Sequence, residues 1–224
     1  MRLRRKNTDP VVEPAGTPDA SVVEPAETSA DPAPAGPVDV EDLDPDTTYI
    51  DLGSMLVAPV DGLELRLQVD EDSGEVLAVL LVAEEGVLEM RAFANSRGGD
   101  LWDEARSEIA ADTERRGGTA TEREGSFGTE LYCQVPVEGP EGESLVQPSR
   151  IVGYNGPRWF VRATMAGRPA MDAEYCAPFE QAIRSLAVRR GHEAMAPGEP
   201  LPLKLPPEAR PQTEDEAATD AGLR

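Results

Sequence analysis

The segment Arg158-Trp159-Phe160-Val161-Arg162 has the pattern in this sequence that is best suited to binding. Side chains alternate across a β-strand, so Arg158, Phe160 and Arg162 are expected on one face. Two guanidinium groups beside an aromatic ring can hold an anion and stack on a planar group. We therefore predict Arg158, Phe160 and Arg162 as a candidate binding surface.

A structural role for these arginines is the competing interpretation. The chain has 43 Asp and Glu against 21 Lys and Arg, so an arginine readily finds an acidic partner. The stem of an arginine also packs well over an aromatic ring such as Phe160. Arg150, Arg168 and Arg184 are expected nearby, either as part of the surface or in ion pairs.

Other reactive residues are few. His192 is the only histidine, so a histidine relay or a His-rich metal site would have to be built from it alone. Cys133 and Cys176 have no metal-ligand spacing and are too few for a disulfide framework, so we expect two buried thiols. The glycine-rich pieces lack the phosphate-loop and dinucleotide patterns. We predict no catalytic residue, no metal and no cofactor.

A β-hairpin is expected to position the candidate surface. Asn155-Gly156 is a preferred pair for a two-residue turn, because both central positions need a positive φ. The flanking runs, 151–154 and 159–164, are predicted to be paired antiparallel strands.

The rest of the middle of the chain alternates between strand and helix patterns. Three strands predict a β-meander, and two more strands follow a helix capped by Asp100. A second helix is capped by Asp172, and Pro178 either kinks it or starts it. The fold class is predicted to be α+β, a mainly antiparallel sheet with two principal helices. The predicted strands are 63–69, 76–82, 87–94, 119–124, 129–135 and an edge strand at 186–190, and the first helix is 101–116.

Composition predicts how the chain is divided. Residues 1–47 are rich in Pro, Ala, Glu and Asp and have no aromatic residue, which is typical of a disordered acidic arm. Residues 48–191 are expected to form a single α/β domain. Residues 192–224 are expected to be a Pro-rich extended tail with a disordered end, which either packs on the domain or binds another protein.

The net charge of -22 disfavours nucleic acid and anionic membranes as partners, because both are bound through Lys and Arg. No apolar stretch reaches the roughly 18 residues of a membrane span. The basic start at 1–6 is not followed by an apolar run, so a secretory signal is not expected. The predicted location is the cytoplasm.

Five passages of the chain carry a family resemblance, namely Asp51–Val57, Leu101–Glu104, Phe127–Leu131, Gly156–Arg162 and Leu201–Pro206. Together they resemble DUF3710, an actinobacterial family of unknown function, over about Tyr49 to Pro206. The resemblance implies an actinobacterial cytosolic protein. Genes of the family often lie near a dUTPase gene, which implies a link to nucleotide metabolism. No catalytic residue is established for the family, so none is carried over.

The order of elements resembles Mog1/PsbP-like α/β/α sandwiches, whose members mostly act as binding or assembly factors; fold alone does not decide function. We expect a non-enzymatic binding or adaptor module with a protein partner. The alternative is an enzyme or accessory factor of nucleotide metabolism, which would need a deep pocket with converging carboxylates or arginines.

Overall fold

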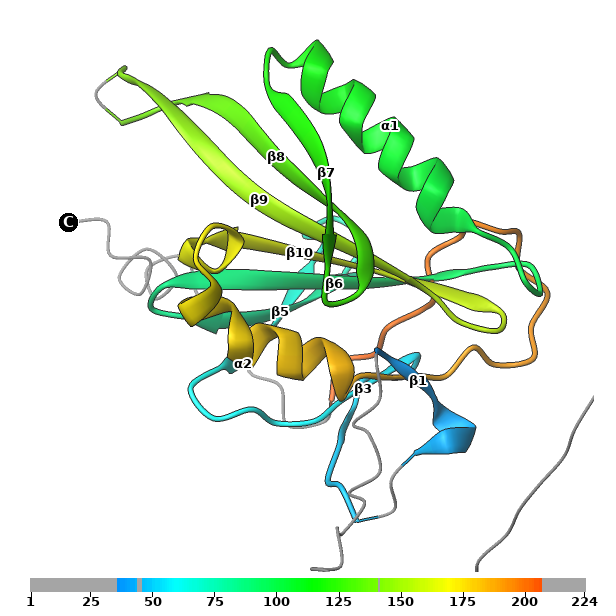
Figure 1. Ribbon diagram of the computed structural model, residues 1–224. Coiled ribbons are helices and arrows are strands. Elements are labelled where there is room, and N and C mark those ends of the chain that lie inside the picture. The colour runs from blue at the N-terminus through cyan, green and yellow to red at the C-terminus, as the bar shows by residue number, and fades with distance from the viewer. Residues whose placement is uncertain (1–35, 44–45, 141, 207–224) are drawn as a thin grey trace, which may run out of the picture. The chain divides into compact units, whose positions relative to one another are not determined.

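The computed structural model describes residues 36–43, 46–140 and 142–206. Within these ranges the chain forms a seven-stranded sheet, a four-stranded sheet and two principal α-helices (Figure 1). The predicted fold class, α+β with a mainly antiparallel sheet, is confirmed.

The large sheet has the strand order β4-β5-β6-β10-β9-β8-β7, and all its neighbours are antiparallel. The meander β4 to β6 pairs with the later strands through β6 and β10. This pairing places Arg91 directly opposite Arg162, although the two residues are far apart in sequence. The strands are β4 (Glu64–Val69), β5 (Val76–Ala83), β6 (Gly86–Ala94), β7 (Thr119–Gly125), β8 (Gly128–Glu138), β9 (Ser144–Asn155) and β10 (Trp159–Gly167).

The small sheet has the order β1-β11-β3-β2, with β1 parallel to β11. The prediction of an edge strand at 186–190 is wrong, because β11 lies between β1 and β3 and is paired on both sides. The strands are β1 (Val38–Asp39), β2 (Ile50–Asp51), β3 (Met55–Val57) and β11 (Ala187–Val188).

Strand β1 also corrects the boundary predicted for the N-terminal arm, residues 1–47. The Val38 N–H donates to the Leu186 carbonyl at 3.0 Å, and Asp39 accepts from Trp159 Nε1 at 3.0 Å. A short 3₁₀ turn, η1 (Val40–Asp42), follows. A two-residue strand is too short to leave a periodic pattern in the sequence. Residues 1–35 and 44–45, the rest of that arm, lie outside the described residues.

The Pro-rich tail packs along β6 as far as it is described. The Ala94 N–H donates to the Glu199 carbonyl at 2.7 Å, and the Leu201 N–H donates to the Ala92 carbonyl at 2.8 Å. Strand β5 pairs with β6 only up to Met90, so the tail occupies the edge of β6 that β5 leaves unpaired. Leu201 is buried. The tail end, 207–224, lies outside the described residues.

Both helices begin at the predicted caps. Asp100 accepts from the Asp103 N–H before α1 (Leu101–Arg115), and Asp172 accepts from the Glu174 N–H before α2 (Ala173–Arg184). Of the two alternatives for Pro178, a kink or the start of the helix, the start is wrong, because Pro178 lies inside α2. Since proline lacks an N–H, this position loses one hydrogen bond of the helix. A second 3₁₀ turn, η2 (Arg168–Ala170), joins β10 to α2.

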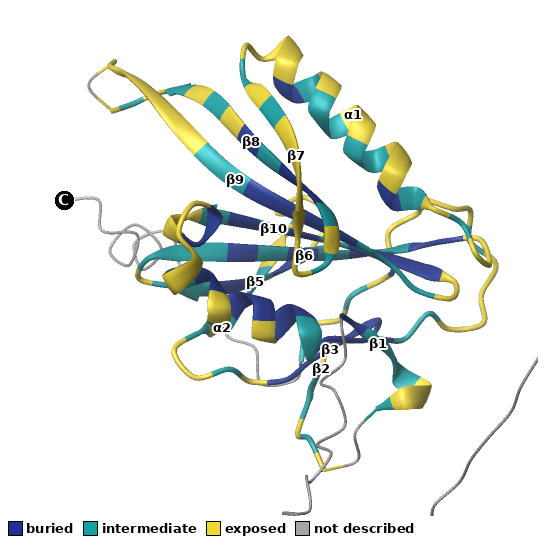
Figure 2. Cartoon of the chain, viewed as in Figure 1, coloured by how far each residue is buried: buried dark blue, intermediate teal, exposed yellow. Residues whose placement is uncertain are grey.

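The two helices cover opposite faces of the large sheet. Trp102 of α1 packs on Ile151 and Phe160, whereas Phe179 of α2 belongs to the cluster that contains Val161. Adjacent residues in a strand point to opposite faces, so α1 and α2 lie on different sides. α1 contacts mainly β7, β8 and β9, and the small sheet and the tail share the α2 side. Each face therefore keeps a half that no helix covers. Exposed residues gather along β7, at the end of β8 and at the start of β9 (Figure 2).

The predicted hairpin is present, but its turn is displaced. Asn155 pairs with Phe160, and the Gly156 N–H donates to the Trp159 carbonyl at 2.8 Å. The turn therefore consists of Pro157 and Arg158, since proline presets φ for the first turn position. Gly156 does not adopt a positive φ. It is glycine because the indole ring of Trp159 lies where a Cβ would be, 2.2 Å away.

Gly153 lies directly beneath Trp102 of α1 and leaves room for its ring. We predict that Gly153→Ala lowers the free energy of unfolding by about 1–3 kcal/mol, the usual cost of overpacking. An added Cβ would lie 2.1 Å from the Trp102 ring. Urea unfolding followed by circular dichroism would measure the change. In a Trp102→Ala background the same substitution should cost much less. An equal cost in both backgrounds would contradict this explanation.

Candidate functional site

The structure does not assemble Arg158, Phe160 and Arg162 into one exposed surface. Phe160 is 3% exposed, and its ring stacks on Phe93 and Trp102, with centroids 5.8 and 6.2 Å apart. That ring lies beneath α1 and cannot stack on a ligand. Arg158 lies in the turn, and only Arg162 extends onto an uncovered part of the sheet.

Arg162 instead has Arg91 as its neighbour. The two residues are directly opposite in the antiparallel pair β6 and β10, on the half of the sheet that α1 leaves uncovered. Their side chains are 32% and 27% exposed, Arg91 first. Like charges in directly opposite positions repel. We call the uncovered α1-side surface of β4, β5, β6 and β10 the arginine face.

Glu89 is the acidic residue that lies between the two guanidinium groups. Its Oε1 is 3.9 Å from Arg91 Nε and 3.7 Å from Arg162 Nη2. Charge-assisted hydrogen bonds are about 2.7–2.9 Å long, so one carboxylate is shared loosely by two cations. Arg91 also donates to the Leu77 carbonyl at 3.1 Å.

The electrostatics of Arg162 reflect this shortage of negative charge. Burial lowers the pKa of the Arg162 guanidinium, Glu89 raises it and Arg91 lowers it again, so that the net direction is downward. An added anion would favour the charged form of Arg162. Two guanidinium groups therefore share a single carboxylate on this face.

The arginine face continues towards β4, at the edge of the sheet. A hollow of about 580 Å³ opens there, lined in part by Glu64, Arg66 and Val82. Arg66 is held by Glu64 through two hydrogen bonds of 3.1 Å. This ion pair supplies polar groups beside the Arg91 and Arg162 pair, and it leaves no net charge.

Sequence reasoning found Arg162 but missed Arg91. The sequence signal that could have found Arg91 is the alternation of Glu89, Arg91 and Phe93 along β6, which places their side chains on one face. What the sequence did not show is that β6 pairs with β10, because that contact joins distant parts of the chain. The structural interpretation of the other arginines also has support, since Arg168 pairs with Glu85 at 3.1 Å.

A buried charge cluster connects the sheet to α2 on the opposite face. Arg150 Nη2 lies 2.8 Å from Glu130 of β8 and 2.7 Å from Glu180 of α2. Arg184 donates to Glu180 at 2.8 Å. The Phe127 N–H, in the β7–β8 turn, donates to Glu130 at 3.3 Å. Arg150 is thus absent from the arginine face, near which it was expected.

Burial by itself lowers the pKa of Arg150, but hydrogen bonds with Glu130 and Glu180 raise it well above its ordinary value. Burial raises the pKa of Glu180, but hydrogen bonds with Arg150, Arg184 and Ser126 lower it by more. The pKa of Glu180 is therefore below its ordinary value. Each group is charged and saturated by its partners, so this cluster is suited to holding α2 in place.

The remaining candidates offer no further chemistry. Both cysteines are free and buried, and burial raises the pKa of each thiol, which disfavours reactive thiolates. His192 is exposed. The described residues include no group of three or more His, Cys, Asp or Glu arranged to hold a metal ion. In the same part of the chain, no helix has the length and apolar character needed to cross a bilayer.

The comparison with protein families identifies the relatives of this chain. A family described as a protein of unknown function, DUF3710, matches residues 36–212. The chain belongs to the DUF3710 family. The matched range begins just before β1 and contains every helix and strand described above. No curated protein matches this DUF3710 protein.

The buried cluster predicts a large effect for Arg150→Met. Removing this guanidinium leaves Glu130 and Glu180 buried without their main partner, so we expect a loss of about 3–5 kcal/mol in the free energy of unfolding. Urea denaturation would measure it. Arg115→Met, at an exposed ion pair, should cost less than about 1 kcal/mol. Similar losses in both variants would refute the assignment.

Glu180 also predicts a pH dependence. Its pKa is lower in the folded state, so its carboxylate stabilises the fold above the unfolded pKa, and this contribution is lost as pH falls through the folded pKa. Glu180→Gln should lower the free energy of unfolding at neutral pH and flatten its decline in acid. Denaturation across the acid range would test this, with Glu108→Gln on the exposed side of α1 as the control that keeps the wild-type slope.

Proposed function

We propose that this DUF3710 protein is a non-enzymatic binding or adaptor module of the cytoplasm, and that Arg91 and Arg162 bind an acidic group of its partner. The observation that supports this is the pair of opposed arginines on an uncovered sheet face, with one loosely placed carboxylate between them. The chain has about twice as many acidic as basic residues, so such a pair stands out from its surroundings.

Repulsion between the opposed Arg91 and Arg162 gives ligand binding an energetic basis. Opposed like charges destabilise an antiparallel pair, and local conflict of this kind is common where a protein binds something. A carboxylate or phosphate group between Arg91 and Arg162 would replace contacts of more than 3.5 Å by short charge-assisted hydrogen bonds. Ligand binding therefore relieves a repulsion that the free protein carries.

Binding fits the geometry better than catalysis does. The alternative, an enzyme or accessory factor of nucleotide metabolism, calls for a deep pocket where carboxylates or arginines converge. Glu130, Arg150 and Glu180 do converge, but all three are buried and paired with one another. The hollow beside the arginine face is open and contains an intact ion pair.

Replacing both arginines should abolish partner binding without damage to the fold. We expect Arg91→Ala with Arg162→Ala to lose partners captured from native cytosol, identified as proteins and as small molecules, because the anion loses both its donors. The melting temperature should stay constant or rise slightly, since a repulsion is removed.

The matched control removes two exposed arginines elsewhere, Arg97→Ala with Arg115→Ala, and should keep the captured partners. Arg158→Ala separately tests the turn arginine. If the Arg91 and Arg162 variant keeps its partners, or unfolds at a much lower temperature, the arginine face is structural and the proposal fails.

A further inference from the structure

A second hollow lies on the opposite side of the sheet, on the half that α2 leaves uncovered. Its volume is about 160 Å³. The floor is formed by alternate residues of β7 and β8, and η2 with the following residue forms one wall. The lining residues with polar side chains on the floor are Thr119, Thr121, Arg123, Tyr132 and Gln134.

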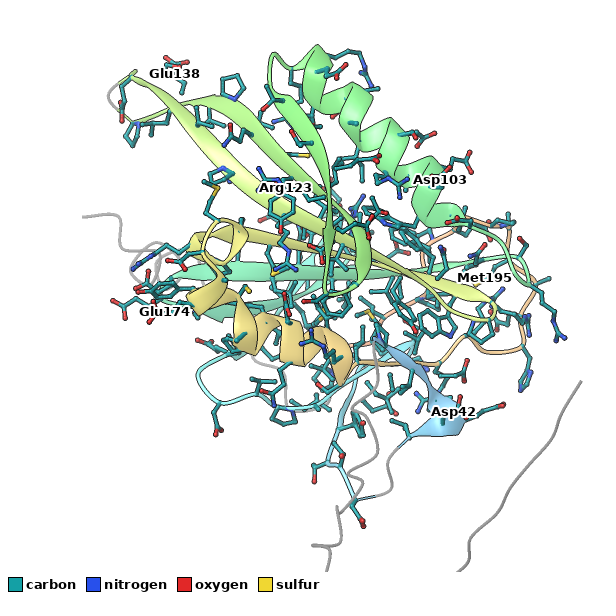
Figure 3. All side chains as sticks on the ribbon, in the orientation of Figure 1. Asp42, Asp103, Arg123, Glu138, Glu174 and Met195 are labelled. Carbon is teal, nitrogen blue, oxygen red and sulfur yellow. The ribbon has the colours of Figure 1, made fainter. Side chains whose placement is uncertain are left out.

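Arg123 is the charged residue in this lining. Its guanidinium lies over the Tyr132 ring, 4.5 Å from the centroid. Glu130, its direct neighbour across the strands, is bound to Arg150 instead, and the ion pairs found among the described residues do not include Arg123. Stacking leaves the edge of the planar guanidinium free to donate to an oxyanion. Figure 3 shows Arg123 on β7.

The acidic residues of β7 point away from the hollow. Glu122 and Glu124 alternate with Arg123 and therefore face the α1 side. Glu122 is bound there by Arg106 at 2.7 Å, and Glu124 accepts from the Thr129 hydroxyl at 2.8 Å. Glu130 is the one carboxylate beside Arg123 on the side of the hollow, directly opposite it across the strands, but Glu130 is fully buried and bound by Arg150. The hollow thus offers hydroxyl and guanidinium donors, and no carboxylate lines it.

Apolar side chains lie exposed around this polar floor. Met171, in the wall, is 65% exposed, and Val146 on β9 is 59% exposed. Strand β7 is the last strand of its sheet, so one edge of its backbone is unpaired in the described chain. A peptide in extended conformation can pair with such an edge while its side chains enter adjacent pockets.

We propose that the hollow at Arg123 and Tyr132 binds an acidic side chain of an extended segment of a partner protein, with a neighbouring apolar side chain of that segment on Met171. The hollow has room for a carboxylate side chain. The site is on the other face from Arg91 and Arg162. It does not depend on the function proposed for them, and two such sites would suit an adaptor.

Nuclear magnetic resonance titration of the full chain with a short polyglutamate peptide containing one methionine tests this site. We expect the resonances of Thr121, Arg123 and Tyr132 to shift and saturate. Arg123→Ala should weaken that binding about tenfold or more, the value of a charge-assisted hydrogen bond. Arg97→Ala is the matched control, and the Arg91 and Arg162 double variant should bind the peptide at Tyr132 as the wild type does.

Three results would overturn the proposal. The first is no shift at these residues, or shifts confined to Arg91 and Arg162, which would leave the function proposed for the arginine face intact. The second is unchanged affinity in Arg123→Ala. The third is displacement of the peptide by inorganic phosphate or acetate at equal concentration, which would assign the hollow to free small anions instead of a protein segment.

Discussion

Two helices cannot cover both faces of a seven-stranded sheet. A helix with its side chains is about 10 Å wide and strands are about 4.8 Å apart, so one helix shields two or three strands. Here α1 covers β7 to β9 on one face, and α2 with the small sheet and the tail covers the other half of the opposite face. The two uncovered halves are therefore a direct consequence of the strand count, and both candidate sites lie on them.

The buried cluster around Arg150 keeps α2 in one position. Burying charges costs solvation free energy, and well-packed apolar residues often serve stability as well or better. What Arg150 provides is geometry, because it bonds Glu130 on the sheet and Glu180 on the helix at the same time. The turn of β7 and β8 joins this arrangement, since Arg184 of α2 lies over the Phe127 ring at 5.0 Å. The cluster therefore links β8, β9 and α2.

Charge is distributed unevenly over this acidic chain. Strand alternation sends Glu122 and Glu124 to the α1 side and Arg123 to the other, and it places Arg91 and Arg162 together on the arginine face. Most other arginines of the described chain have a close carboxylate partner, as Arg106, Arg150 and Arg168 do. Arg91 and Arg162 on one side of the sheet, and Arg123 on the other, place positive charge on two uncovered surfaces. The proposed connector between two acidic partners would use this arrangement.

Local pattern alone determined the elements of this protein: the alternating run of β4, the caps Asp100 and Asp172 and the paired strands around Gly156 all follow from backbone and side-chain preferences within a few residues. The family membership was also recognisable in the sequence. Tertiary structure alone decided that β6 pairs with β10 and that β11 lies between β1 and β3 in a second sheet. It also decided that Phe160 is covered while Arg91 joins Arg162. The reason is physical: periodicity states which side chains share a face of one strand, whereas the neighbour across the sheet and the helix above it depend on contacts between distant segments, which no local pattern encodes.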